Sequence, residues 1–233
     1  MNGLFTDYHC HVLPELDDGA KNISESIDMI QMMQAQGIKK IIATPHFYPQ
    51  KGMSTTEFIS KREQSYNKLC NAIDIPVDFN LGAEVYLIHD ISNISGIEKL
   101  HISDSTFILF EMPFVPYEKW IEQEICNIAF EHKLTPIIAH LDRYLDLIKL
   151  DDLMNLLSST RIVVQINYES VSNRKVIKLI KYLLENDIEV VFGTDAHGIN
   201  HRPPEISKAL KVLQKKLGKQ VYEKIVKINK NIK

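Results

Sequence analysis

The stretch Ile41-Ile42-Ala43-Thr44-Pro45-His46 indicates the fold most directly, because an apolar run ends at once in a histidine. A run that is apolar at successive positions is typical of a parallel strand whose faces are both covered. The stretch Ile162-Val163-Val164-Gln165-Ile166 has the same character. Both stretches therefore predict buried strands of a parallel α/β sheet.

Apolar runs of this kind alternate with amphipathic stretches along all 233 residues. The predicted strands cover 4–9, 38–44, 77–84, 107–112, 135–140, 161–167 and 189–194. The predicted helices cover 24–36, 55–72, 117–132, 150–158, 172–186, 204–217 and 218–229, with Ser24 as the first N-cap and Gly37 ending that helix. Seven strands alternating with helices predict a parallel sheet, either open or closed into a barrel. No linker interrupts the pattern, so we expect one domain over 1–233.

The composition indicates a cytoplasmic protein without disulfides. A formal net charge of -3 argues against electrostatic binding of bulk nucleic acid, although metals could still attract an anionic substrate. The three cysteines, Cys10, Cys70 and Cys126, form no C-x-x-C pair, which favours a reducing compartment. We see no signal peptide and no apolar run near the roughly 18 residues of a membrane span, so membrane insertion is not expected.

Histidines and carboxylates gather at the carboxyl ends of six of the seven predicted strands. These ends carry function in open α/β sheets and in barrels alike. The histidines, carboxylates and arginines at or just after these strand ends are His9, His11, Asp17, Asp18, His46, Glu84, Glu111, His140, Asp142, Arg143, Asp195, His197 and Arg202. Only the sixth strand, which ends in Gln165-Ile166-Asn167, adds no charged group. Each residue alone has an ordinary structural explanation, but their joint placement predicts a metal site.

The spacing of these residues supports more than one metal. In an extended segment residues i and i+2 point the same way, so His9 and His11 can reach one centre, as can Asp195 and His197. Buried carboxylates are costly unless they are paired or bind a metal. Five histidines and at least three carboxylates exceed the needs of one ion, and such mixed ligands suit Zn, Mn or Fe.

Other catalytic schemes lack their motifs. A cysteine-nucleophile phosphatase needs an arginine six residues after its cysteine, but those positions hold Leu16, Pro76 and His132. The chain contains no G-x-S-x-G elbow, no P-loop and no dinucleotide fingerprint. We therefore expect water, activated by metal, to be the nucleophile.

Taken together, the motifs resemble those of the polymerase-and-histidinol-phosphatase (PHP) superfamily of trinuclear metal phosphoesterases. More narrowly, the chain is similar to bacterial manganese-dependent protein-tyrosine phosphatases of the CpsB/YwqE type, found with capsule and exopolysaccharide genes. The signature consists of D-x-H-x-H-x-L-P-x-x-D-D-G (7–19), A-T-P-H (43–46), G-A-E (82–84), H-x-D-R-Y (140–144) and G-T-D-A-H (193–197). The resemblance covers about 5–202 and implies a distorted (β/α)7 TIM-like barrel.

The resemblance also implies a role for each site residue. Three divalent metals, Mn²⁺ first and Fe, Zn or Co as alternatives, would be held by His9, His11, Asp18, His46, Glu84, Glu111, His140, Asp195 and His197. The ligands of the first metal would be His9, His11, Glu84 and Asp195. Glu84 would also bridge to the second metal, whose other ligands would be Glu111 and His140. The ligands of the third metal would be Asp18, His46 and His197. The adjacent Asp17 stays an alternative to Asp18. Arg143 and Arg202 would bind the substrate phosphate. By its position alone, and not by the resemblance, Asp142 is a candidate general acid or a residue that orients Arg143.

The implied activity is hydrolysis of phosphotyrosine on proteins. A phenol of pKa about 10 leaves without much protonation, which suits a site whose general acid is uncertain. The implied partner is the C-terminal tail of a membrane-associated bacterial tyrosine kinase that controls polysaccharide export. Alternatives are a small-metabolite phosphatase of the histidinol-phosphate type, a nuclease, or a non-catalytic metal-stabilised binding module.

Overall fold

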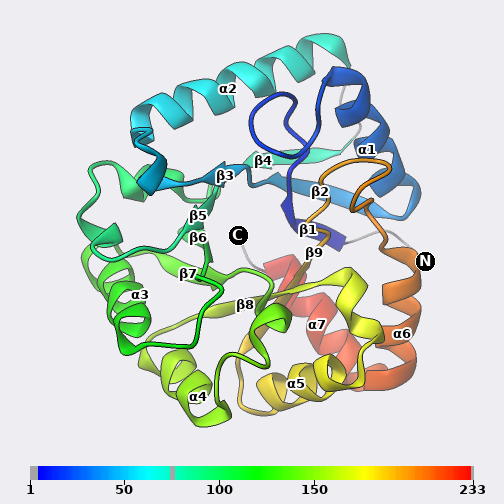
Figure 1. The fold of residues 1–233 in the computed structure, drawn as a ribbon. Helices are drawn as coiled ribbons and strands as arrows, with labels where there is room; N and C mark the ends of the chain where they lie inside the picture. Colours follow the sequence, from blue (N-terminus) through cyan, green and yellow to red (C-terminus); the bar gives the residue numbers. More distant parts are fainter. Residues whose placement is uncertain (1–4, 74–76, 232–233) are drawn as a thin grey trace.

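The computed structural model describes residues 5–73 and 77–231, in which parallel strands surround a common axis and helices pack outside them (Figure 1). The strands are β1 Phe5–Cys10, β2 Ile38–Ala43, β3 His46–Phe47, β4 Asp78–Leu81, β5 Glu84–Tyr86, β6 Phe107–Glu111, β7 Thr135–Ile138, β8 Val163–Asn167 and β9 Glu189–Gly193. The α-helices are α1 Ile23–Ala35, α2 Thr55–Ala72, α3 Lys119–Glu131, α4 Leu150–Ser159, α5 Arg174–Glu185, α6 Ser207–Leu217 and α7 Lys219–Asn231. Short 3₁₀ turns are η1 Pro49–Lys51, η2 Ile91–Asn93, η3 Ile97–Leu100, η4 Leu141–Tyr144 and η5 Tyr168–Ser172.

Hydrogen bonds connect the two sheets, of order β1-β2-β4 and β3-β5-β6-β7-β8-β9, into one barrel. The second predicted strand, 38–44, is β2, and Pro45, which lacks an N–H to donate, separates it from the short β3 that follows. The third is interrupted between β4 and β5, but Gly82 N–H donates to Ala43 O at 2.8 Å and bridges the gap. At the other edge, Asp195 N–H donates to His9 O at 2.7 Å. The predicted TIM-like barrel is therefore confirmed, and the breaks after β2 and β4 both fall beside predicted site residues.

Alternating side chains divide the buried residues between two layers. Inside the barrel, Tyr8, Leu109 and Val191 belong to one apolar cluster, while Cys10 belongs to the larger cluster between strands and helices. A register shift against β2 between Asp7 and Cys10 breaks the strict alternation here, so His9 and His11 turn inward as Tyr8 does, while Cys10 packs in the larger cluster. The polar residues of the β1 carboxyl end therefore face the barrel axis.

Helix α7 lies across the amino end of the strands. The hydroxyl of Tyr8 donates to Asn229 O at 3.0 Å, and Ile228 packs against the inner apolar cluster. The last turn of α7 consequently lies near the barrel axis, as Figure 1 shows. Among the described residues no helix is both long and apolar enough to cross a bilayer.

The helix boundaries differ from prediction where local hydrogen bonds compete. Ser24 is not the cap of α1, because Asn22 has an extended backbone and its side chain accepts from Glu25 N–H at 3.0 Å. Asparagine caps helices at least as well as serine, so the helix starts earlier than expected. Gly37 has a φ of 99° and ends the helix in the predicted left-handed conformation.

Candidate metal centre

Four donor atoms from three strand ends converge on one point. The Nε2 atoms of His9 and His11 lie 3.1 Å apart, and they lie 3.0 and 3.2 Å from Oε2 of Glu84. Oδ1 of Asp195 lies 3.5 and 3.4 Å from the same two nitrogens. Donors about 2.1 Å from a common cation are spaced by roughly 3.0–3.4 Å at octahedral or tetrahedral angles. The first predicted group therefore has the spacing of a metal site.

The second predicted group lies on the other side of the Glu84 carboxylate. Oε1 of Glu84 is 2.9 Å from His140 Nε2, which is 3.8 Å from Oε1 of Glu111. On the Oε2 side, His46 Nδ1 lies 3.0 Å from Glu84 and 3.9 Å from Glu111. Glu84 thus lies between two sets of donors, in the position that the resemblance gives to a bridging carboxylate.

The third predicted group faces solvent. His46 and His197 point their Nε2 atoms at Oδ1 of Asp18, at 3.6 and 3.5 Å. Donor atoms of these three residues and of His11 lie within 4.8 Å of one another. Asp18 is 70% exposed, whereas His197 is nearly buried. His46 turns one ring nitrogen toward Glu84 and the other toward Asp18, so its ring lies between two groups rather than in one.

The buried carboxylates of this cluster favour the binding of cations. Burial is the largest influence and opposes ionisation of Glu84 and Asp195, but the neighbouring histidines, His9 first among them, together outweigh it and hold the pKa of both carboxyls well below the ordinary range. Burial, followed by the charge of Glu84, raises the pKa of Glu111. Oε2 of Glu84 and Nδ1 of His46 lie 3.0 Å apart without forming a hydrogen bond, and Oε2 of Glu111 is likewise buried without one. Buried polar atoms are rarely left without a partner, so this donor set fits divalent metals.

Asp17 and Asp18 point to opposite sides, which separates their roles. Oδ2 of Asp17 lies 2.7 Å from Nδ1 of His11 and accepts from His46 N–H at 2.9 Å, while Oδ1 accepts from Gly19 N–H at 3.0 Å. A carboxylate behind the imidazole keeps the proton on Nδ1 and leaves Nε2 free for a metal. Asp17 therefore supports His11, and Asp18 is the one that reaches the third group.

The sixth predicted strand, which is β8 in the structure, supplies hydrogen bonds to the donor residues that the sequence analysis did not predict. Oε1 of Gln165 lies 3.0 Å from Nδ1 of His9 and accepts from His140 N–H at 2.6 Å. Its amide donates to Asn167 Oδ1 at 2.9 Å, and Asn167 donates to Oδ2 of Asp195 at 3.2 Å. Two amides at i and i+2 on a strand that is otherwise apolar were the available signal.

Both predicted phosphate-binding arginines point at the same carboxylate. Arg143 and Arg202 form ion pairs with Oδ2 of Asp195, and the side chains are 33% and 29% exposed. Nη1 of Arg202 also lies 3.1 Å from Nε2 of His197. Asp142, the candidate general acid, accepts from Asn167 N–H at 3.0 Å, and burial raises the pKa of its carboxyl. The arginines thus border the donor cluster, whereas Asp142 is hydrogen-bonded to the backbone of β8.

The backbone at these positions adopts conformations that most residues avoid. His140, Asp195 and Arg202 have φ values of 32°, 52° and 50°. Positive φ in residues other than glycine costs free energy and concentrates at functional sites, where surrounding contacts maintain it. All three residues come directly from the predicted cluster, so the strain accompanies the placement of its side chains.

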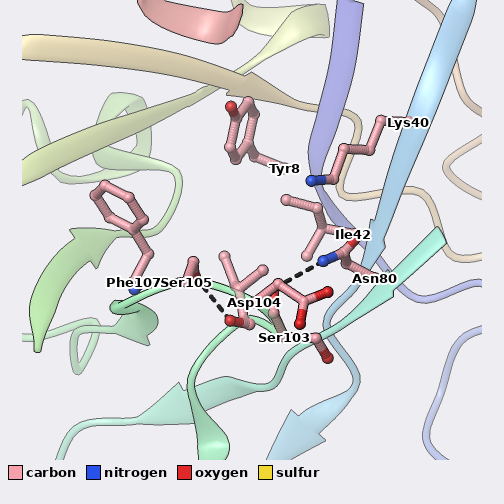
Figure 2. A pocket seen from close by; sticks show the side chains of 9 residues that line it. Tyr8, Lys40, Ile42, Asn80, Ser103, Asp104, Ser105 and Phe107 are labelled. Atoms are coloured by element: carbon pink, nitrogen blue, oxygen red, sulfur yellow. Dashed lines mark hydrogen bonds between the residues drawn. The ribbon is translucent and has the colours of Figure 1, made fainter. Parts of the chain in front are cut away.

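Two hollows lie at opposite ends of the barrel. One, of about 330 Å³, is lined by Asp17, Asp18 and His46 of the donor cluster. The other, of about 210 Å³, opens at the amino end between Tyr8, Lys40 and Phe107 (Figure 2). Its polar side chains are partly engaged, since Asn80 donates to Ser103 O at 2.7 Å. No residue of the three donor groups lines it.

An α/β barrel with clustered histidines and carboxylates at the carboxyl ends of its strands defines a metal-dependent barrel hydrolase. Within that class, the family model "Capsular polysaccharide synthesis, CpsB/CapC" matches residues 5–232, so this chain belongs to the CpsB/CapC family. The resemblance predicted from the motifs is therefore confirmed.

Characterised relatives and solved structures agree with this assignment. The chain is 30% identical to tyrosine-protein phosphatase YwqE of Bacillus subtilis over 92% of this chain and 86% of the relative. It is 28% identical to tyrosine-protein phosphatase CpsB of Streptococcus pneumoniae, over 91% and 90%. A crystal structure from work on these two "unique metal-dependent tyrosine phosphatases" superposes with a TM-score of 0.79, 26% identity and coverage of 97% and 93%. A TatD family hydrolase of Entamoeba histolytica, 12% identical with a TM-score of 0.59, shares the fold alone.

Proposed function

We propose that this protein is a metal-dependent phosphatase that hydrolyses phosphotyrosine in proteins. The observation that carries the proposal is the convergence of His9, His11, Glu84 and Asp195 at donor spacings of 3.0–3.5 Å. Membership in a family whose curated members include tyrosine-protein phosphatases supports the choice of substrate. The absence of a cysteine-arginine motif in the sequence supports water as the nucleophile.

We propose Mn²⁺ as the physiological metal, held by the three groups of residues that the family resemblance implies. The donors are imidazole nitrogens and carboxylate oxygens only, which suits Mn²⁺, Fe²⁺ or Zn²⁺. When bound, such metals make water a nucleophile near neutral pH and neutralise charge on phosphate oxygens. Within the chain, Asp17 and Gln165 would keep the rings of His11 and His9 oriented for this binding.

The two arginines would bind the phosphoryl group. Each guanidinium is about one-third exposed and carries N–H groups beyond those directed at Asp195. A guanidinium matches phosphate oxygens with two parallel hydrogen bonds, and its charge offsets the charge that develops during in-line transfer. Their common contact with Asp195 would hold both groups beside the donor cluster.

Asp142 would hold a proton near the leaving group or orient Arg143. Burial raises the pKa of its carboxyl, which favours the proton-holding role. Its hydrogen bond to Asn167 N–H favours the orienting role. A phenolate needs little protonation to leave, so phosphotyrosine is the substrate least dependent on this choice.

Purified protein with Mn²⁺ should release phosphate from a phosphotyrosine peptide and should lose that activity with chelator. Histidinol phosphate and single-stranded DNA, tested in parallel, represent the alternative activities. Full activity after complete, verified removal of metal would refute the metal dependence. Rapid turnover of histidinol phosphate with none of phosphotyrosine would refute the substrate assignment.

We also propose that the partner is a cytoplasmic phosphotyrosine segment, namely the C-terminal tail of a bacterial tyrosine kinase that controls capsule or exopolysaccharide production. The family description and the names of the relatives support this choice. A phosphorylated tail should be dephosphorylated faster than an unrelated phosphotyrosine protein of equal concentration. Equal rates for both would contradict a dedicated partner.

A further inference from the structure

The hollow beside the donor cluster contains groups that the phosphate chemistry leaves unused. Its volume is about 330 Å³, and Asp17, Asp18 and His46 form one wall. The remaining wall contains apolar, aromatic and cationic side chains, namely Leu16, Phe47, Tyr48, Lys51 and Met53. A substrate whose phosphate lies at the donor groups therefore has this second wall next to it.

Lys51 provides the positive charge of this hollow. Its Nζ lies 3.9 Å from the centroid of the Tyr48 ring, a cation–π contact. Within the described residues Lys51 has no carboxylate partner, unlike two other lysines nearby. Lys61 pairs with Glu57 at 2.8 Å, and Lys68 pairs with Glu15 at 3.3 Å. The charge of Lys51 is thus available to a ligand.

The backbone holds Lys51 in place through a short turn. Lys51 N–H donates to Tyr48 O at 3.0 Å, and Gly52 N–H donates to Pro49 O at 3.0 Å. Gly52 ends the turn with a φ of 82°, a left-handed conformation that glycine adopts without steric cost. A charge that is already positioned loses less conformational entropy when it pairs with a ligand.

Stacked rings connect this charge to the donor cluster. Tyr48 stacks on His46 with ring centroids 4.7 Å apart, and its centroid lies 5.6 Å from that of Tyr86. In the extended segment, His46 and Tyr48 occupy positions i and i+2 and so point the same way. Lys51, Tyr48 and His46 therefore form one continuous wall from solvent to the metal donors.

The hollow continues as a groove along α2. A neighbouring hollow of about 300 Å³ shares Leu16 and Met53 with it and reaches Lys61 and Ser65 on that helix. An extended polypeptide advances about 3.3–3.6 Å per residue, so a segment beside the phosphate would reach Lys51 within a few residues. The two arginines that would bind the phosphate lie at Asp195 and not in this groove. The groove is therefore available to the rest of the substrate.

From these observations we infer that the groove holds the polypeptide next to the phosphotyrosine and that Lys51 pairs with an acidic side chain in it. The inference rests on the proposed phosphotyrosine activity and adds a preference to it. An ammonium group beside apolar Leu16 and Met53 favours a carboxylate carried on an aliphatic stem. Glutamate within a few residues of the phosphotyrosine therefore fits this groove.

The test combines a substrate change with an enzyme change. Phosphotyrosine peptides carry one Glu, or the isosteric Gln, at each of the three positions before and after the tyrosine. The ratio of kcat/KM for Glu over Gln is measured with Mn²⁺ for the wild type, Lys51→Gln, Lys51→Arg and Lys178→Gln. Lys178 is exposed on α5 and serves as the matched control, since the same charge is lost far from the groove.

We expect the wild-type protein to prefer Glu at one or more positions by about two- to fivefold, the range for an exposed ion pair. The preference should vanish in Lys51→Gln, persist in Lys51→Arg and Lys178→Gln, and weaken as salt is added. Equal rates for Glu and Gln at all positions, or a preference unchanged in Lys51→Gln, overturn the inference while the phosphatase activity stands. No metal-dependent turnover of any peptide overturns both.

Discussion

Replacement of Asp17 by Asn isolates a carboxylate that supports the metal site without facing a metal. Asp17 uses two oxygens for three contacts, with His11 Nδ1 at 2.7 Å, His46 N–H at 2.9 Å and Gly19 N–H at 3.0 Å. Asparagine offers one acceptor oxygen, so in either rotamer its NH₂ group faces an N–H donor. The side chain is only 7% exposed, and solvent cannot repair the mismatch.

The expected cost appears in two quantities. Loss of a carboxylate behind a ligating histidine weakens metal affinity by about 10–100-fold, which corresponds to about 1.4–2.7 kcal/mol. The buried unpaired donor also lowers the free energy of unfolding of the metal-free protein by about 1–3 kcal/mol. For a chain of this size, a loss near 2 kcal/mol lowers Tm by roughly 4–8 °C.

Three measurements check this prediction: activity against free Mn²⁺ concentration, metal content after dialysis, and Tm with and without metal. Excess Mn²⁺ should restore most of the turnover of Asp17→Asn, because the ligands themselves remain. Asp28→Asn, an exposed change on α1, is the control and should match the wild type. If Asp17→Asn has wild-type metal affinity and Tm, the assignment of Asp17 to the support of His11 is refuted.

Further replacements test the other roles. Arg143→Ala and Arg202→Ala should each lower kcat/KM by about 10²–10³-fold with metal content near normal; if both retain full activity, the phosphate-binding role is wrong. Gln165→Leu should lower metal retention about 10–100-fold, because His9 Nδ1 and His140 N–H lose their acceptor; unchanged metal content after dialysis would contradict this. Asp142→Asn should slow an alkyl phosphate far more than phosphotyrosine if Asp142 is the general acid, while equal losses would indicate that it orients Arg143.

Local sequence patterns were sufficient to predict the framework of the site. Apolar runs alternating with amphipathic stretches predicted the barrel strands, and the two-residue period of a strand predicted that His9 and His11 point inward together. The boundary errors arose where a nearby side chain competed, as Asn22 did with Ser24 at the start of α1. These features depend on neighbours in the chain, which is why they can be read without coordinates.

The family resemblance predicted which residues meet, but not how they are held. Asp17 and Asp18 are adjacent and chemically identical, and only the course of their loop past His11 and His46 turns one inward and the other outward. The position of the His46 ring between two donor groups likewise depends on Glu84 of the neighbouring strand. Such orientations follow from packing between strands, which the motif spacing does not encode.

The sequence by itself determined the parallel strands and the donors at their carboxyl ends, because backbone periodicity and the strand-end rule act locally. The barrel and the metal-dependent class followed from the resemblance of its motifs to a known family. Only the tertiary structure decided which groups orient the donors. Gln165 contacts His9 across 156 positions, and this contact exists because barrel closure brings β8 and β9 round to β1. Only the folded barrel likewise shows that Lys51 and Tyr48 line the same hollow as the metal donors. Contacts between residues so far apart in the chain depend on the closed fold, so a short sequence motif cannot predict them.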